Sequence, residues 1–304
     1  MAISRAQLVK ELEPGLNALF GLEYKNYGEQ WTEIFDTETS DRAFEEEVML
    51  AGFANAAVKP EGQGVTFDDA QETFTARYTN ETVALAFAIT EEAIEDNLYD
   101  RLASRYTKAL ARSMSNAKQV KAVTPLIDGL PSTDGYDSGD GVSLFNTSHT
   151  TVSGTAVKNT LSTQADLNET SLEQALIDIA GMTDERGLRV AARGVKMIIP
   201  SANQFNAERL MKSQGRTGTA DNDINAVSSM GMIPQGYRVN NFLTDTDSWY
   251  IITDVPNGMK MFQRAALKTA MEGDFDTGNV RYKARERYSF GVSDFRGIFG
   301  VEGA

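Results

Sequence analysis

The chain has 304 residues, 41% of them hydrophobic and 24% charged, which is the composition of an ordinary globular protein with one large domain or two smaller ones. Its 43 acidic residues outnumber its 29 Lys and Arg, and a net charge of −14 disfavours a protein built to grip nucleic-acid phosphates. Cysteine is absent and His149 is the only histidine, which excludes disulfides, thiol catalysis and a Cys/His zinc site. No apolar run approaches the roughly 20 residues that cross a bilayer, so we expect a soluble protein.

Residues 1–44 are predicted to form an N-terminal arm. Ser4 and Gln7 have the spacing of a helix capping box, and an apolar stripe follows them. We expect Pro14 to interrupt this helix, which leaves an arm too short to bury its own apolar face. The arm must therefore pack on something else, either the rest of its own chain or a neighbouring subunit.

Residues 45–80 are predicted to form a long hairpin. Its two extended limbs flank a turn of sequence Lys-Pro-Glu-Gly-Gln-Gly that begins at Lys59, where the glycines can adopt positive φ. The first limb starts with three consecutive glutamates, Glu45, Glu46 and Glu47. A hairpin with so little core-forming sequence is marginally stable unless it lies on another surface.

A strand with strict alternation, residues 82–89, leads directly into the longest predicted helix, at about residues 90–123. Acidic residues occupy the start of this helix and basic residues follow, an order that complements the helix dipole only at the two ends. A solvated face is the simplest explanation of the basic residues, and contact with acidic groups of another subunit is the alternative. Pro125 is expected to end the helix.

A mixed domain is predicted over residues 165–257. Thr170 and Glu173 have capping-box spacing at the start of one helix, and a short buried strand at residues 195–199 precedes another helix. Alternating strands and helices of this kind indicate an α/β or α+β domain.

The β-rich end of the chain separates charged from apolar side chains. Apolar residues between Val280 and Val292 fall on one face of a predicted strand, and a row of four cations falls on the other. Like charges on one strand face repel one another unless acidic residues lie opposite. We therefore predict that both charged segments and the hairpin tip contact other subunits. The predicted contact residues are Glu45, Glu46, Glu47, Lys59, Arg281, Lys283, Arg285 and Arg287.

Motifs for catalysis or cofactor binding are missing from the sequence. It has no phosphate-binding loop, no dinucleotide-binding glycine pattern and no Gly-x-Ser-x-Gly. The run from Asp221 to Asn225 begins like a calcium loop but lacks the required glycine and final acid. Ser148 precedes His149, yet adjacency in sequence does not make a catalytic pair. We predict no catalytic residue, no metal site and no cofactor, and a pair of carboxylates close in space is left open.

The order of these parts resembles the major capsid proteins of tailed bacteriophages, which have the HK97-like fold. The stretches that carry the resemblance are Val195–Phe205 with Leu210–Lys212, Met232–Val239, Val280–Ser293 and Ser289–Phe299. The resemblance implies an α+β fold with four parts. They are an N-terminal arm (1–44), an extended hairpin or E-loop (45–80), a peripheral domain with a long spine helix (81–164 and 258–304), and an axial domain (165–257).

The resemblance also implies a function. Such a subunit would assemble with itself into the hexamers and pentamers of an icosahedral head that encloses double-stranded DNA, first in the bacterial host cytoplasm and finally in the virion. Other partners would be a portal protein and, in many relatives, scaffolding, protease or decoration proteins, with no sequence-specific nucleic-acid binding and no membrane. Some relatives crosslink a hairpin lysine, although a lysine at a polar turn such as Lys59 is more often only solubilising.

Two alternatives to the phage head stay open. The first is the shell of a cellular nanocompartment of the encapsulin type, which shares the fold but encloses an enzyme. The second and less favoured is a hydrolase that uses carboxylates, which would be a monomer or small oligomer with a pocket.

Overall fold

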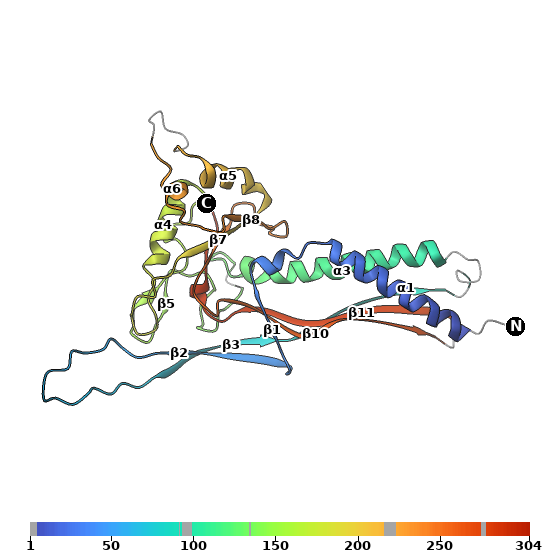
Figure 1. The fold of residues 1–304 in the computed structure, drawn as a ribbon, viewed down its shortest axis with the longest axis horizontal. Helices are drawn as coiled ribbons and strands as arrows, with labels where there is room; N and C mark the ends of the chain where they lie inside the picture. Colours follow the sequence, from blue (N-terminus) through green and yellow to red (C-terminus); the bar gives the residue numbers. More distant parts are fainter. Residues whose placement is uncertain (1–4, 91, 93–98, 134, 216–222, 275–277) are drawn as a thin grey trace.

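The computed structural model describes residues 5–90, 92, 99–133, 135–215, 223–274 and 278–304 (Figure 1). Figure 1 shows an elongated layer of helices over strands, a second group of helices and strands at one end of it, and a hairpin that projects past that end. Helices and strands are mixed along the chain, which confirms the α+β prediction.

The first sheet has the strand order β1-β10-β11-β4. Its strands are β1 (Asp36–Thr39), β4 (Glu81–Ile89), β10 (Met259–Gly273) and β11 (Val280–Val292). β1 runs parallel to β10, and the other neighbours are antiparallel. The register between β10 and β11 shifts between Gln263 and Lys268, so β10 bulges in its middle.

Helices α1 (Arg5–Asn26) and α3 (Tyr99–Asp128) cover one face of this sheet (Figure 1). Leu16 and Phe20 of α1 belong to a small apolar cluster that also includes Tyr282 of β11 and residues of α3. The opposite face of the sheet carries the basic side chains of β11, and no helix of the described residues covers it (Figure 1).

Two prolines that were expected to interrupt helices lie inside them. Pro14 lies within α1, and Pro125 lies within α3, which runs to Asp128 rather than ending near residue 123. A proline removes one backbone hydrogen bond, and tertiary packing can outweigh that loss. Leu16 and Leu126, which follow the two prolines closely, are both buried, so apolar contacts hold the next turn in place. The long helix was predicted to begin at about residue 90, and residues 91 and 93–98 of that stretch lie outside the described residues.

The second sheet has the strand order β12-β9-β7-β8. Its strands are β7 (Gly194–Ile199), β8 (Tyr237–Val239), β9 (Trp249–Thr253) and β12 (Ile298–Val301). The helices of this part are α4 (Glu169–Ala180), α5 (Gln204–Lys212) and α6 (Ala226–Met230). Shorter elements are η1 (Gln30–Glu33), β5 (His149–Thr150), β6 (Ala156–Val157), η2 (Ser201–Asn203) and η3 (Phe295–Gly297).

The cap of α4 differs from the predicted one. Asn168 is the N-cap residue, and its side chain accepts the backbone N–H of Ser171 at 2.9 Å. The Ser171 hydroxyl accepts the Asn168 N–H in return at 3.0 Å. Asparagine is a strong N-cap residue, and this reciprocal pair places Thr170 and Glu173 inside the helix instead of at its cap.

One large apolar core joins the second sheet to the near end of the first. Its largest fully buried members include Phe145, Trp249, Tyr250, Phe295 and Phe299. Aromatic side chains bury more apolar surface than any others, so this cluster dominates the stabilisation of the fold.

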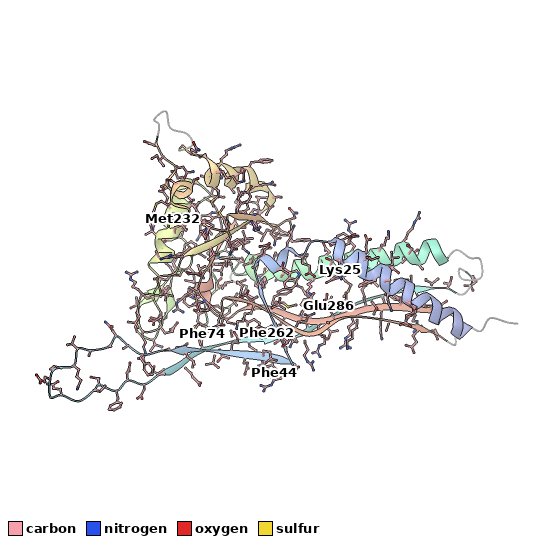
Figure 2. The ribbon with its side chains drawn as sticks, viewed as in Figure 1. Lys25, Phe44, Phe74, Met232, Phe262 and Glu286 are labelled. Atoms are coloured by element: carbon pink, nitrogen blue, oxygen red, sulfur yellow. The ribbon has the colours of Figure 1, made fainter. Side chains whose placement is uncertain are left out.

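The strands β2 (Phe44–Ala51) and β3 (Gln71–Thr79) pair antiparallel to form a hairpin. The paired strands pack on the rest of the chain, where Tyr78 is buried against Phe262 of β10 and Phe74 lies against Phe295 (Figure 2). Residues 52–70 form no strand and extend beyond the second sheet (Figure 1). The apolar side chains of this extension are exposed and pack on no described residue outside the hairpin, and Phe67 is 94% exposed.

Candidate functional site

The basic side chains of β11 lie on the face of the first sheet that the helices leave uncovered. Arg281, Lys283 and Arg285 are exposed and Arg287 is half-buried, while the residues between them are buried. The alternation predicted for this strand is confirmed over these positions.

Two cations of β10 extend this basic face. Arg264 and Lys268 line a groove of about 330 Å³ together with Lys283, Arg285 and Arg287, and its other lining residues are alanines and a threonine. Lys268 lies directly across from Arg285 in the strand register. The sequence did not reveal Arg264 and Lys268, because the bulge in β10 breaks the alternation that would have identified their face.

Most of these cations have no counter-ion in the described part of the chain. Arg281 pairs with Asp274, with 2.5 Å between Nη2 and Oδ2. Lys283, Arg285 and Arg287 form no ion pair with any described residue, and the neighbouring strand β4 places small uncharged residues across from them. The groove therefore presents positive charge to whatever covers it.

The strand pleat separates the three predicted glutamates of β2. Glu45 and Glu47 turn toward the rest of the chain. Glu45 accepts a hydrogen bond from the Ser40 hydroxyl at 2.7 Å, which holds the pKa of this carboxyl below its usual value. Glu47 pairs with Lys260 at 2.6 Å and accepts a hydrogen bond from the Ser293 hydroxyl. These two carboxylates anchor the hairpin to its own subunit.

Glu46 turns to the opposite side of the hairpin. It lies 3.7 Å from Arg77 of β3, and both side chains are about half exposed. The Arg77 guanidinium sits 4.0 Å from the ring centre of Phe44. Phe44 lies on the side of the hairpin that faces away from the rest of the chain (Figure 2). Glu46 is therefore the member of the acidic triplet that a second protein could reach most readily.

Lys59 is exposed at the tip of the hairpin extension. Among the ion pairs between described residues, none joins Lys59 to a carboxylate, and none joins the three glutamates to the basic row of β11. The chain by itself therefore does not bring the predicted acidic and basic contact residues together.

An ion pair that the sequence did not reveal lies between α3 and β11. Lys118 Nζ is 3.4 Å from Glu286 Oε2, both side chains are buried, and the ammonium lies 4.8 Å from the Trp31 ring centre. Burial raises the pKa of Glu286, and the charge of Lys118 opposes that shift. The available signal was an acid at an inward position of an otherwise apolar strand face.

His149 is fully buried and has a structural role. Its Nδ1 lies 2.5 Å from Asp140 Oδ2, its Nε2 lies 3.1 Å from Asn159 Oδ1, and its ring stacks on Phe295 at 3.8 Å. A catalytic base needs a free nitrogen within reach of a substrate proton. Both nitrogens of His149 are occupied, so this residue cannot serve as one.

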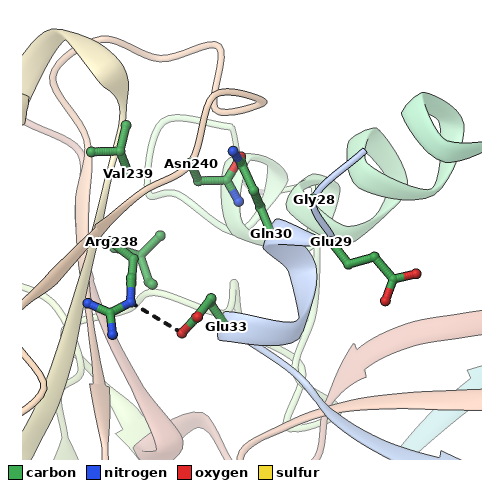
Figure 3. Close-up of a pocket in the computed structure, with 8 residues that line it drawn as sticks. Gly28, Glu29, Gln30, Glu33, Arg238, Val239 and Asn240 are labelled. Atoms are coloured by element: carbon green, nitrogen blue, oxygen red, sulfur yellow. Dashed lines mark ion pairs between the residues drawn. The ribbon is translucent and has the colours of Figure 1, made fainter. Parts of the chain in front are cut away.

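A cleft of about 260 Å³ lies between residues 28–33 and β8 (Figure 3). Glu33 lies 2.7 Å from Lys196 and 3.5 Å from Arg238, and the hydrogen bond from Lys196 lowers the pKa of Glu33. Figure 3 shows the Glu29 carboxylate directed away from Glu33. The cleft thus lacks the facing pair of carboxylates, one of them kept protonated, that a carboxylate-based hydrolase uses.

The described part of the chain shows neither a metal site nor a membrane-spanning helix. No group of three or more His, Cys, Asp or Glu side chains there could hold a metal ion. No helix there is long and apolar enough to cross a membrane. The candidate site is therefore the exposed basic face of the first sheet together with the projecting hairpin.

Known proteins resemble this chain in sequence pattern and in fold. The phage capsid protein family matches residues 71–301, which is more than half of the chain, and no curated protein sequence matches it significantly. The virus-like particle from Pyrococcus furiosus superposes with a TM-score of 0.56 at 10% identity, covering 94% of this chain and 98% of that one.

Two further solved structures agree with this likeness. The capsid of an empty GTA particle gives a TM-score of 0.56 at 12% identity, with 91% of this chain and 90% of that one covered. The capsid of Myoviridae phage XM1 gives 0.54 at 12% identity, with 91% and 92% covered. At such low identity the likeness to these structures shows the fold alone, and it confirms the fold expected from the order of the parts.

Proposed function

The chain belongs to the phage capsid protein family, and from this premise we propose that copies of it bind one another through the basic face and the hairpin to build an icosahedral head. It is a structural shell subunit located in the virion, and it is not an enzyme. The family match favours a phage head over a nanocompartment shell, and the geometry of the Glu33 cleft gives the hydrolase alternative no support.

We assign the parts of the chain as the resemblance implies. The proposed parts are the arm (1–44), the E-loop hairpin (45–80), the peripheral domain (81–164 and 258–304) and the axial domain (165–257). In this assignment α3 and the first sheet, apart from β1 of the arm, belong to the peripheral domain, and the second sheet belongs mainly to the axial domain. The shared apolar core supports a rigid junction between these two domains.

The proposed partners extend beyond the subunit itself. Copies would form hexamers and pentamers in the host cytoplasm, with a portal protein at one vertex and double-stranded DNA inside. Scaffolding, protease or decoration proteins would join at stages of assembly. An acidic protein repels nucleic-acid phosphates, so the net charge of −14 supports a shell that encloses DNA without sequence-specific binding.

One observation carries the assembly proposal: two exposed surfaces of the chain lack partners among its own described residues, one for its charges and the other for its apolar side chains. One is the basic face, whose cations Lys283, Arg285 and Arg287 have no counter-ion in the described chain. The other is the hairpin extension, where Val58 is 93% exposed. Complementary charge on a second copy would neutralise the first surface and set the register of the contact, and Glu46 is the member of the acidic triplet best placed to contribute.

Electron microscopy of the purified protein, with light scattering on the same sample, tests the function. Closed shells or rings of subunits are expected, alone or on co-expression with the neighbouring genes. The nucleic-acid content of purified shells separates a phage head from a nanocompartment. A protein that stays monomeric under both conditions would refute the proposal.

Charge reversal tests the basic face directly. The triple variant Lys283→Glu, Arg285→Glu, Arg287→Glu should reduce shell yield by at least about tenfold, because like charges brought together across an interface cost several kcal/mol. The far-ultraviolet circular dichroism of the subunit should not change.

A matched control carries the same change in net charge at exposed cations elsewhere. It combines Arg42→Glu, Arg193→Glu and Arg209→Glu, and it should assemble. If the two triple variants assemble equally well, or are equally blocked, the basic face is not a specific contact surface.

A further inference from the structure

We propose that Arg186 is a positioning residue for assembly, because it joins both limbs of the hairpin where they leave the subunit and so sets the direction in which residues 53–68 project. The inference rests on the proposed function, in which the hairpin lies on a neighbouring copy. It adds to that function a device within one chain that orients the hairpin before any neighbour is bound.

The Arg186 guanidinium bridges the two limbs. Its Nε donates to the carbonyl oxygen of Gly52 at 3.1 Å, and its Nη2 donates to the carbonyl oxygen of Asp69 at 2.5 Å. Gly52 directly follows β2, and Asp69 lies just before β3. One further bond crosses between the limbs next to the arginine, from the Ala54 N–H to Asp68 Oδ2 at 2.7 Å.

The turn that carries Arg186 has a fixed conformation. Asp184 Oδ1 accepts the N–H groups of both Arg186 and Leu188, at 2.9 and 2.8 Å. Gly187 follows with φ of +83°, a left-handed conformation that glycine adopts without strain. The backbone at Arg186 is therefore held by local hydrogen bonds on both sides.

The same turn is tied to the interior of the subunit. Glu185 is buried, and its Oε1 lies 2.6 Å from Nη2 of the buried Arg296. The Nε of Arg296 also donates to the Thr183 carbonyl oxygen at 2.8 Å. A buried charge pair with these extra hydrogen bonds leaves the turn little freedom, so Arg186 links the hairpin to a rigid support.

The chemistry of the contact requires arginine. A guanidinium is planar and carries several N–H donors in a fixed arrangement, so it can hold two carbonyl oxygens at once. A lysine ammonium is a compact charge and would reach one limb at a time. Arginine also stays protonated at any physiological pH, so the contact does not depend on pH.

The apolar side chains at the far end of the hairpin extension do not orient it. Val58, Val65 and Phe67 are exposed by 93%, 70% and 94%, and no described residue outside the hairpin packs on them. Association is weakened by the entropy of ordering a mobile segment, and a segment already held in direction loses less. The contact at Arg186 should therefore speed and direct docking.

The absence of cysteine allows a direct measurement. Spin labels at Glu61→Cys on the hairpin tip and Ala180→Cys on α4, both exposed positions, report the direction of the hairpin in the unassembled subunit by pulsed electron paramagnetic resonance. The distance distribution should be narrow in this pair and clearly broader when Arg186→Ala is added. An unchanged distribution would overturn the proposal.

Two further variants make the measurement specific. Arg189 lies in the same turn, but its guanidinium donates to the Gly181 carbonyl oxygen and not to the hairpin. Arg189→Ala should therefore leave the distance distribution narrow. Arg186→Lys should give an intermediate width. Equal broadening by Arg189→Ala would mean that the turn as a whole, and not the bridging contact, orients the hairpin.

Assembly followed by light scattering tests the consequence. Arg186→Ala should slow shell formation by about tenfold relative to Arg189→Ala, while the urea midpoint of the subunit stays the same. Equal rates, or a slower rate explained by a lower midpoint, would overturn the role in assembly. If wild-type protein never forms shells, the proposed function fails, whereas the spin-label distances still decide whether Arg186 orients the hairpin.

Discussion

At the scale of single residues, buried polar groups hold irregular segments to the core. Asp140 and Asn159 lie in the connection between α3 and α4, and His149 between them stacks on Phe295 near the end of the chain. Burial alone would raise the pKa of Asp140, but the hydrogen bond and charge of His149, with hydrogen bonds from Ser138 and Val142, hold it below its usual value. The ionised carboxylate therefore stabilises the folded state.

Asp140→Asn should lower the free energy of unfolding by about 2 kcal/mol at neutral pH, the scale of hydrogen bonds to a charged group. Because the folded-state pKa lies below the unfolded value, the contribution of the carboxylate is complete above that value and is lost as the pH falls through the folded-state pKa. The loss of unfolding free energy in the variant, relative to the wild type, should thus be complete at neutral pH and should shrink below about pH 4. Urea unfolding across this range measures it.

The control for this prediction is Asp41→Asn, at an exposed aspartate. It should change stability little at any pH in the series. A deficit of Asp140→Asn that stays constant from neutral to acid pH would contradict the assignment of a stabilising carboxylate.

At the scale of elements, α1 shows how a segment with no core of its own is held. Phe20 is 2% exposed, and its ring lies 6.5 Å from that of Tyr282 on β11. Asn17 Oδ1 accepts hydrogen bonds from Thr269 at 2.7 Å and from Tyr282 at 2.8 Å. The arm therefore packs on its own chain, one of the two outcomes that the sequence left open.

Phe20→Ala should lower the free energy of unfolding of the isolated subunit by about 3–4 kcal/mol, the usual cost of removing a buried phenylalanine. Limited proteolysis should then cut near residues 5–26 first. Leu22→Ala is the control on the same helix, because Leu22 is 67% exposed. Equal effects of the two variants would show that α1 does not dock on its own chain.

At the scale of the whole molecule, charge is distributed unevenly. The net charge is −14, yet Arg264, Lys268 and the basic row of β11 gather positive charge on one sheet face. Subunits of equal net charge repel one another at long range, whereas complementary patches attract at short range. Salt screens both effects, but it acts first on the long-range repulsion.

The rate of assembly should therefore pass through a maximum as salt is raised. Between about 10 and 150 mM the Debye length falls from roughly 30 to 8 Å, and weaker repulsion should speed association. Near about 1 M the charged contacts should be weakened in turn. Light scattering over this series measures the rate, and a rate that only falls from the lowest salt upward would contradict the balance of forces described here.

Much of the architecture could be predicted from local sequence. The alternation from Val280 to Arg287 identified which side chains of β11 are buried, because successive side chains of a strand point to opposite faces whatever surrounds them. The alternation at residues 82–89 identified β4 for the same reason. The order of the parts was enough to indicate the fold, and the resemblance that it carried indicated a shell subunit.

Other features were decided only by contacts between distant residues. Pro14 and Pro125 remain inside helices because neighbouring side chains are buried against other elements. Arg264 and Lys268 join the basic face because a bulge changes the register of β10. A local period fixes which way a side chain points, whereas burial, register and ion pairing depend on what the folded chain brings opposite it, and this is why only the tertiary structure could place the hairpin against Arg186.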